Sequence, residues 1–257
     1  MRGAAALELE NVTRTFGTKV AVAQLSLQVQ VGELFAFLGP NGAGKTTTIK
    51  MICGLLRPNQ GTLRVCGYDA LRQPELARAA LSYVPDNPYL YEKLTGREFF
   101  QLVLDLYNIS PTEGKRRLDY LIQIFDLSNY LDDLTETYSH GMKQRVAFAA
   151  ALLHGAPVLI VDEPTLGLDP FAMRALKNLL RQYTRQGATV FLSTHSLDLV
   201  EALADRIGII AQGRLIAVGT LEELRRRTHC TGSLEEVFLQ LIEGALHQQG
   251  HGTPCRS

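Results

Sequence analysis

Cysteine is scarce in this sequence and is never paired at close spacing. The four cysteines, at positions 53, 66, 230 and 255, include no Cys-x-x-Cys pair. This absence argues against a zinc site and a disulfide framework, and it favours a reducing compartment. An excess of one charge is also lacking, because 26 Lys and Arg side chains balance 26 Asp and Glu side chains. Without a basic excess, we expect no nucleic acid partner.

Long apolar runs are missing too. The longest apolar region, residues 146–161, is interrupted by His-Gly-Ala-Pro at residues 154–157. It therefore divides into a helix end and a strand, and we expect no membrane span. Residues 7–10 read Leu-Glu-Leu-Glu where a secretory signal would be apolar, so none is expected. If the protein acts at a membrane, we expect a different chain to supply the membrane part.

A glycine loop between a strand and a helix is the most informative stretch that is present. The apolar residues 34–38 predict a buried strand, and residues 47–55 predict a helix. Between them, residues 39–46 read Gly-Pro-Asn-Gly-Ala-Gly-Lys-Thr, the spacing of a phosphate loop. Lys45 is placed to contact the β- and γ-phosphates, and the Thr46 hydroxyl to ligate Mg²⁺. The alternative is a glycine-rich turn followed by Lys and Thr by chance.

Strand and helix patterns alternate along the chain, which predicts an α/β fold with a mainly parallel sheet around the phosphate loop. Residues 1–86 are expected to hold an antiparallel β subdomain and the first part of the nucleotide-binding core. Residues 87–155 are expected to form a helical subdomain, and residues 156–220 the second part of the core. Residues 221–257 are expected to be a helical extension that becomes disordered after Leu246.

Two carboxylates end another apolar strand. Residues 158–161 predict the strand, and Asp162 and Glu163 follow directly. In phosphate-loop proteins a carboxylate at a neighbouring strand end holds Mg²⁺, the role expected for Asp162. Glu163 is then expected to be the general base, which accepts a proton from a water aligned with the γ-phosphate. The alternative is that both carboxylates only end a strand at a solvated rim.

A histidine and a capped helix complete the candidate constellation. His195 follows the apolar strand at residues 189–192, and strand ends in open α/β sheets converge on the ligand crevice. We expect its imidazole to hydrogen-bond the γ-phosphate or the attacking water, although a single His is more often structural. Ser139 is predicted to cap a helix that runs to Leu153, while Gly141 leaves the helix start open to an anion. Taken alone, this is an ordinary helix N-cap.

Together these motifs resemble those of the ABC ATPases, in that family's order and over nearly the whole chain. Residues 39–46 match the Walker A loop, residues 139–142 the signature, and residues 158–163 Walker B. Residues 167–169 are similar to the D-loop, and His195 to the switch histidine. Five motifs in the family's order leave little room for coincidence.

The resemblance implies a subunit that works as a pair, with two Mg-ATP held between the phosphate loop of one subunit and the signature of the other. Each motif occurs once, so a second ATP-binding chain is needed, and we expect a homodimer. Phe16 matches the aromatic that stacks on adenine, with turn packing as the alternative. The residues implied to contact nucleotide are Phe16, Gly39, Asn41, Gly42, Gly44, Lys45, Thr46, Thr47, Ser139 and Gly141.

Two positions depart from the family's pattern. Asp86 stands where the family usually has a glutamine that senses Mg²⁺ and links the active site to the membrane partner. An Asp can ligate Mg²⁺ but is shorter and charged, so we expect a ligand with an altered coupling role. His140 replaces the usual first glycine of the signature, a change we expect to be tolerated because Ser139 and Gly141 are retained.

The end of the chain favours a transport role. Residues 221–224 and 233–238 are similar to the subfamily that serves drug, lipid or polysaccharide export. We therefore expect an ATPase on the cytoplasmic face of the membrane, peripherally bound, that drives export through a separate transmembrane permease. The alternative is a soluble ABC ATPase that acts in assembly or repair, although the second cassette or coiled-coil insert frequent there is missing. The permease would select the substrate, so this chain does not identify it.

An aromatic connecting segment is the candidate partner surface. Residues 85–91 read Pro-Asp-Asn-Pro-Tyr-Leu-Tyr, and exposed aromatic clusters mark protein interfaces. In the family, a short cytoplasmic helix of the permease docks in this region. Our hypothesis is that Tyr89, Leu90 and Tyr91 line that groove and that Asp86 relays the nucleotide state to it. The alternative is that the segment packs back on its own helical region.

Overall fold

Two β-sheets carry the fold in the computed structural model, which describes residues 5–164, 170–230 and 232–250. The antiparallel sheet has the order β2-β1-β4-β5, with β1 Ala5–Phe16, β2 Lys19–Gln30, β4 Gln60–Val65 and β5 Tyr68–Asp69. The larger sheet has the order β10-β9-β3-β8-β7-β6, with β3 Leu34–Leu38, β6 Leu81–Val84, β7 Val158–Asp162, β8 Thr189–Thr194, β9 Arg206–Ala211 and β10 Arg214–Gly219. Its pairings are parallel except that of β10 with β9. The predicted α/β fold, with an antiparallel N-terminal sheet and a mainly parallel core, is confirmed.

The centre of the larger sheet is buried on both faces. Every residue of β3, β7 and β8 is buried, in keeping with the mainly apolar sequences of these strands. The strands β3, β8, β7 and β6 are neighbours and run in the same direction. Their carboxyl ends therefore meet at one edge, where the segments that follow them lie side by side.

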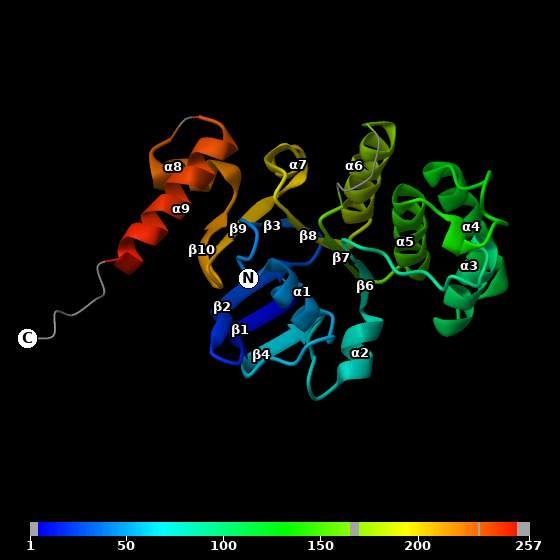
Figure 1. The fold of residues 1–257 in the computed structure, drawn as a ribbon, viewed down its shortest axis with the longest axis horizontal. Coiled ribbons are helices and arrows are strands. Elements are labelled where there is room, and N and C mark those ends of the chain that lie inside the picture. Colours follow the sequence, from blue (N-terminus) through cyan, green and yellow to red (C-terminus); the bar gives the residue numbers. More distant parts are fainter. Residues whose placement is uncertain (1–4, 165–169, 231, 251–257) are drawn as a thin grey trace, which may run out of the picture.

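Helices pack at both ends of the larger sheet and between the two sheets (Figure 1). The helix α1, Lys45–Ile52, lies between the sheets, and its apolar face joins a core shared with both. A second core unites the sheet with the helices α3 Gly96–Leu106, α4 Pro111–Phe125, α5 His140–His154 and α6 Pro170–Arg185. A third lies under α7 Leu197–Leu203, α8 Leu221–Thr228 and α9 Leu234–Gly250, while α2, Pro74–Ala79, contributes to the core between the sheets. Within the described residues, none of the helices is long and apolar enough to cross a membrane.

Helix starts follow the local signals in the sequence. Thr95 and Glu98 form a reciprocal capping box at α3, with the Thr95 N–H donating to Glu98 Oε2 at 2.8 Å. The predicted cap at Ser139 is confirmed, because the Met142 N–H donates to Ser139 Oγ at 3.3 Å. That helix ends at His154, one residue beyond the predicted Leu153.

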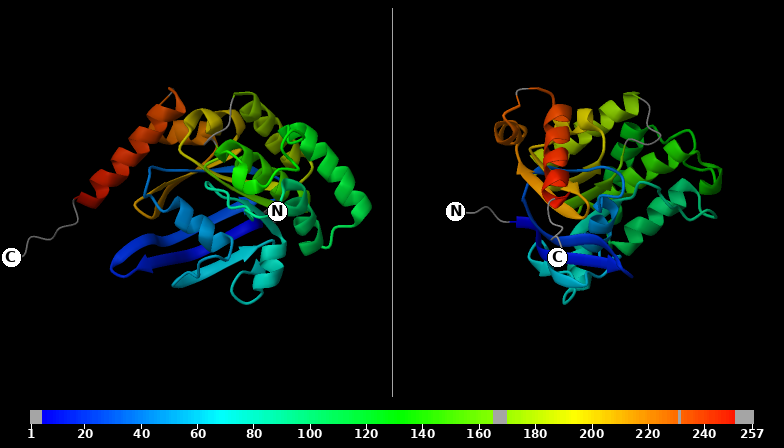
Figure 2. Two further views of the ribbon diagram at one scale, coloured as in Figure 1. Left: turned by 45° about the vertical axis from the view of Figure 1, so that its right-hand side comes forward. Right: turned by 60° about the vertical axis from the view of Figure 1, so that its left-hand side comes forward.

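The structure describes the C-terminal helix as far as Gly250, and the expected disorder after Leu246 stays a prediction. The helix α9 continues to Gly250, because His, Gln and Gln at residues 247–249 are compatible with a helix and no proline interrupts it. A glycine at the end is typical of a helix terminus. Figure 2 shows α9 extending away from the two sheets.

Candidate active site

The glycine loop is packed tightly between distant segments. Gly44 has a φ of 108°, and a Cβ there would lie 2.6 Å from the carbonyl oxygen of Ala21. A Cβ at Gly39 would lie 2.4 Å from the carbonyl oxygen of Ile210, so both positions exclude a side chain. The Gly213 N–H, in the turn between β9 and β10, donates to the Ala43 carbonyl at 2.8 Å. The loop conformation thus depends on β2 and on the β9–β10 turn.

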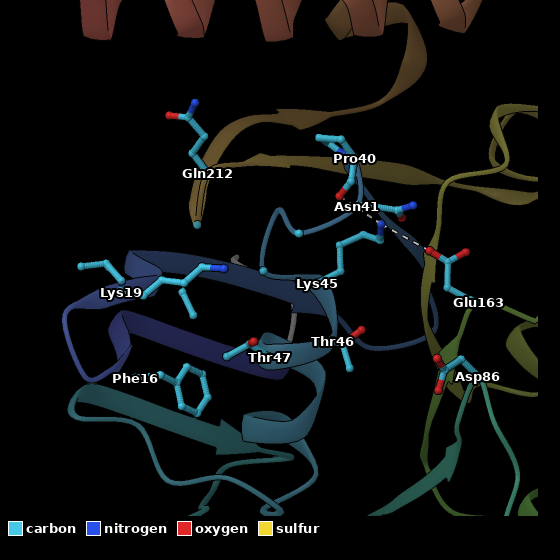
Figure 3. A pocket seen from close by; sticks show the side chains of 15 residues that line it. Phe16, Lys19, Pro40, Asn41, Lys45, Thr46, Thr47, Asp86, Glu163 and Gln212 are labelled. Carbon is cyan, nitrogen blue, oxygen red and sulfur yellow. Dashed lines mark hydrogen bonds and ion pairs between the residues drawn. The ribbon is translucent and has the colours of Figure 1, made fainter.

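An open cleft of about 600 Å³ lies over this loop. It is lined by Phe16, Lys19, Val20, Ala21, Pro40, Asn41, Gly42, Gly44, Lys45, Thr46, Thr47, Asp86, Glu163, Gln212 and Gly213. Figure 3 shows Phe16 and Lys19 on one side of Lys45 and Thr46, with Asp86 and Glu163 on the other. The cleft therefore has an aromatic end, a central phosphate loop and an acidic end.

Three charged or polar side chains form a chain of contacts at the acidic end. The Lys45 ammonium lies 3.3 Å from Glu163 Oε1 and donates to the Gly39 carbonyl at 2.7 Å (Figure 3). The Glu163 Oε2 lies 2.8 Å from His195 Nδ1 and accepts the backbone N–H of His195. Glu163 has a φ of 47°, a left-handed conformation that costs energy outside glycine, and its N–H donates to the Ser193 carbonyl at 2.8 Å. Backbone and side chain together fix this carboxylate between Lys45 and His195.

Asp162 lies below the cleft and is completely buried. Burial, with smaller contributions from the nearby carboxylates of Asp86 and Glu163, raises the pKa of its carboxyl to about 6. Among the described residues, neither of its oxygens has a hydrogen-bond partner of normal geometry. A buried acid without a partner is the environment that a bound cation would stabilise. No group of three or more His, Cys, Asp or Glu residues gathers to hold a metal in the described part of the chain.

The structure brings most of the sequence-predicted residues to this cleft. Gly39 lies beneath it, and His195 reaches it through Glu163. Ser139 and Gly141 do not line it, since they stand at the start of α5 with Ser139 exposed. The proposed D-loop at residues 167–169 lies outside the described residues.

Sequence reasoning missed one wall of the cleft. Lys19, Val20 and Ala21 come from the start of β2, while Gln212 and Gly213 come from the β9–β10 turn. A Gly at a hairpin turn was the sole local signal for the second pair. Their position next to the loop follows from long-range hydrogen bonds, such as that from the Ala23 N–H to the Gly213 carbonyl at 2.8 Å.

Comparisons with known proteins agree on one family. The family model for ABC transporters matches residues 22–166. The chain is 36% identical to the linearmycin resistance ATP-binding protein LnrL of Bacillus subtilis, over 94% of this chain and 80% of that protein. It is 38% identical to the Nod factor export ATP-binding protein I of Paraburkholderia xenovorans, over 84% of this chain and 71% of that protein.

Solved structures give the same result. An ATP-binding subunit of an ABC transporter superposes with a TM-score of 0.89 at 37% identity, covering 92% of this chain and 99% of that one. The ATP-binding cassette MJ0796, dimeric in a post-hydrolysis state with ADP and Pi, superposes with a TM-score of 0.73 at 26% identity, covering 84% and 98%.

Proposed function

The chain belongs to the ABC transporter family, and from this premise we propose how its own residues bind and hydrolyse ATP. It is an ATP-binding, ATP-hydrolysing subunit. The single observation that carries the residue assignment is the contact chain from Lys45 through Glu163 to His195 at the end of the phosphate loop. ATP would lie along the cleft with its base at Phe16 and its γ-phosphate at Lys45.

Glu163 is the general base in this proposal. When the γ-phosphate takes the place of Glu163 as the partner of the Lys45 ammonium, the carboxylate is free to accept a proton from the attacking water. The water oxygen bonds to the γ-phosphorus, the bond to the β-phosphate oxygen breaks, and ADP and phosphate result. The 2.8 Å contact to His195 holds the carboxylate in the direction of the water.

Mg²⁺ fits the residues at the acidic end. Thr46 contributes a hydroxyl at the loop, and Asp162 contributes buried carboxylate oxygens that lack a partner among the described residues. Oxygen ligands of this kind are those that Mg²⁺ prefers, and its charge would assist departure of the β-phosphate oxygen. Asp86 lines the same end of the cleft and is proposed as a ligand through water.

A second copy of the chain is the proposed partner in ATP binding. Ser139 and Gly141 lie at the N-terminus of α5, outside their own cleft, where a helix N-terminus favours an anion. In a homodimer this N-terminus would face the γ-phosphate held by the other subunit. Each complete ATP site would then consist of the cleft of one subunit and the α5 N-terminus of the other.

The proposed membrane partner is a separate permease. Relatives of this chain are named for antibiotic resistance and for Nod factor export, which supports export and a peripheral position at the cytoplasmic face of the membrane. A groove beside α3 is the proposed docking surface, with Tyr89 79% exposed at its rim. Leu90 lines the same groove although it is only 3% exposed, whereas Tyr91 is not among the residues that line it. The Leu90 side chain belongs to the hydrophobic core beneath the groove.

The variant Glu163→Gln tests the shared site. The amide keeps the shape but accepts no proton, so hydrolysis should fall by roughly 10²- to 10⁴-fold while Mg-ATP still binds. Gel filtration with Mg-ATP should then show a stable dimer. The matched control is Lys45→Ala in the same background, which should remain monomeric. A Glu163→Gln protein that binds ATP yet stays monomeric contradicts the two-chain site.

A further inference from the structure

The aromatic end of the cleft is backed by an arginine. The Arg14 guanidinium carbon lies 4.7 Å from the centroid of the Phe16 ring, over its face. Phe16 lines the cleft and is 48% exposed, whereas Arg14 does not line it. The guanidinium thus covers one face of the Phe16 ring. The opposite face is left for a nucleotide base.

The guanidinium is held by a segment remote from the loop. Its Nη1 donates to the Arg57 carbonyl at 2.9 Å, in the connection between α1 and β4. The same connection is also hydrogen-bonded to the residues of β1 on either side of Arg14. Asn59 Oδ1 accepts the Thr15 N–H at 2.8 Å, and the Asn59 N–H donates to the Thr13 carbonyl at 2.8 Å. Arg14 thus has a fixed support, although Phe16 itself is half exposed at a turn.

The Nε nitrogen of Arg14 indicates why the guanidinium packs against the Phe16 ring. This nitrogen is buried and has no hydrogen-bond partner among the described residues. Leaving a charged donor unpaired costs free energy, and a flat cation recovers part of it on the electron-rich face of an aromatic ring. Planar stacking on such a ring is a property of Arg that Lys lacks.

We propose that Arg14 is a positioning residue for the nucleotide base, which acts through Phe16 in a stack of guanidinium, ring and base. The guanidinium holds the ring against β1, so that stacking on the base requires less ordering of an exposed side chain. This inference rests on the proposed role of Phe16 in stacking. It adds a residue that never touches the nucleotide.

A double-mutant cycle tests whether Arg14 acts through Phe16. Binding of Mg-ATP is measured by displacement of a fluorescent ATP analogue, with Arg14→Met, Phe16→Ala and the double variant. Arg14→Met should weaken binding about two- to fivefold, the range of an exposed cation–π contact. Phe16→Ala should weaken it about fivefold or more, since stacking on the base is lost. The double variant should match Phe16→Ala within about 1.5-fold.

Further measurements distinguish a positioning role of Arg14 in nucleotide binding from a purely structural role. Arg14→Met should raise KM for ATP and leave kcat within about twofold, as expected for lost uniform binding. Arg14→Lys, which keeps a cation without the planar fork, should recover part of the affinity. The matched control is Arg64→Met on β4, an arginine whose ion pairs with Glu8 and Glu10 lie outside the cleft. It should bind Mg-ATP as the unaltered protein does.

The outcomes distinguish this inference from the function it rests on. The effect of Arg14→Met on Mg-ATP affinity is compared in the original protein and in the Phe16→Ala variant. If the loss of affinity is the same in both, Arg14 only supports the strand and the inference is overturned. If Arg14→Met has no effect while Phe16→Ala does, the inference falls and base stacking stands. If Phe16→Ala itself binds Mg-ATP normally, the stacking role fails and the Arg14 inference fails with it.

Discussion

The nucleotide cleft and the groove beside α3 are built in opposite ways. The cleft takes its lining from segments as far apart as Phe16 and Gly213, and that lining includes the lysines Lys19 and Lys45 and the carboxylates Asp86 and Glu163. The groove takes its lining from residues 82–154 alone, with aromatic and small side chains such as Phe99, Tyr107 and Ala147. Among the described residues that line the groove there is no Lys, Arg, Asp or Glu.

The difference matches the two proposed roles, ATP hydrolysis at the cleft and docking at the groove. Charge stabilisation and proton transfer need groups fixed to within fractions of an ångström, which interlocked strand ends provide. An apolar groove recognises a partner by shape and by loss of exposed area, so one stretch of chain is sufficient. Changes in the cleft should therefore alter turnover, and changes in the groove should alter association.

Removal of the loop lysine should give the largest effect. Lys45→Ala takes a buried positive charge away from the γ-phosphate, and losing one such contact costs roughly 10²- to 10³-fold in rate. Steady-state phosphate release is the measurement. The control is Lys50→Ala, an exposed lysine on the same helix, which should retain the full rate. ATPase activity like that of the unaltered protein in Lys45→Ala would refute the site assignment.

Removal of the two exposed tyrosines, Tyr89 and Tyr91, should leave turnover almost unchanged and abolish association. Tyr89 and Tyr91 are 79% and 56% exposed, so replacing both with Ser should cost little stability. We expect basal ATPase activity within about twofold of the original, together with loss of co-purification with the permease. Tyr68→Ser, on the antiparallel sheet, is the control for loss of an exposed tyrosine. Normal co-purification of the double variant would place docking elsewhere, and a lowered melting temperature would assign the tyrosines to packing.

A histidine in the groove should give the smallest effect, on stability. His154 stacks on Tyr107 with ring centroids 3.6 Å apart, and its Nδ1 lies 3.0 Å from Ser82 Oγ. Burial lowers the pKa of His154 below its ordinary 6.5, and the nearby Arg117 charge adds to the shift. Below pH 6.5 the unfolded chain therefore binds more protons at this position than the folded one. Stability from His154 is complete above pH 6.5 and is lost as the pH falls through the folded pKa.

Urea unfolding at pH 7.5 and at pH 5.5 checks this sign. The original protein should lose more free energy of unfolding on acidification than His154→Gln does. The difference should stay well under the limit for one proton, about 1.4 kcal/mol per pH unit, because the imidazole is only half-buried. Equal losses in the two proteins would show that the groove histidine carries no pH dependence.

The elements and site residues that could be predicted are those encoded by a few neighbouring residues in the sequence. The strand before the glycine loop, the Ser139 cap and the carboxylates after β7 could be identified because each signal lies within a few residues. Lys19 and Gln212 could not, since their position at the cleft is set by contacts between β2, the loop and the β9–β10 turn.

Burial was equally hard to predict from the sequence. Tyr89, Leu90 and Tyr91 form an apolar run without periodicity, and only the packing of α3 and α5 beneath them decides that Leu90 faces inward. Arg14 gave no signal either, because nothing in the sequence places its guanidinium over the ring two residues later. Both residues depend on tertiary packing.

The strand order also determines when the loop can be completed during synthesis. Among the described strands, β3 pairs with β8 and β9, which are made more than 150 residues later, and the Ala43 carbonyl accepts its hydrogen bond from the still later Gly213 N–H. The glycine loop is therefore synthesised before the strands and the turn that it contacts in the folded protein. Until β8 and β9 have emerged, the apolar β3 lacks the strands it pairs with and is of the kind that chaperones bind. A nascent chain of this protein should gain its nucleotide affinity abruptly, once residues 206–213 have been synthesised.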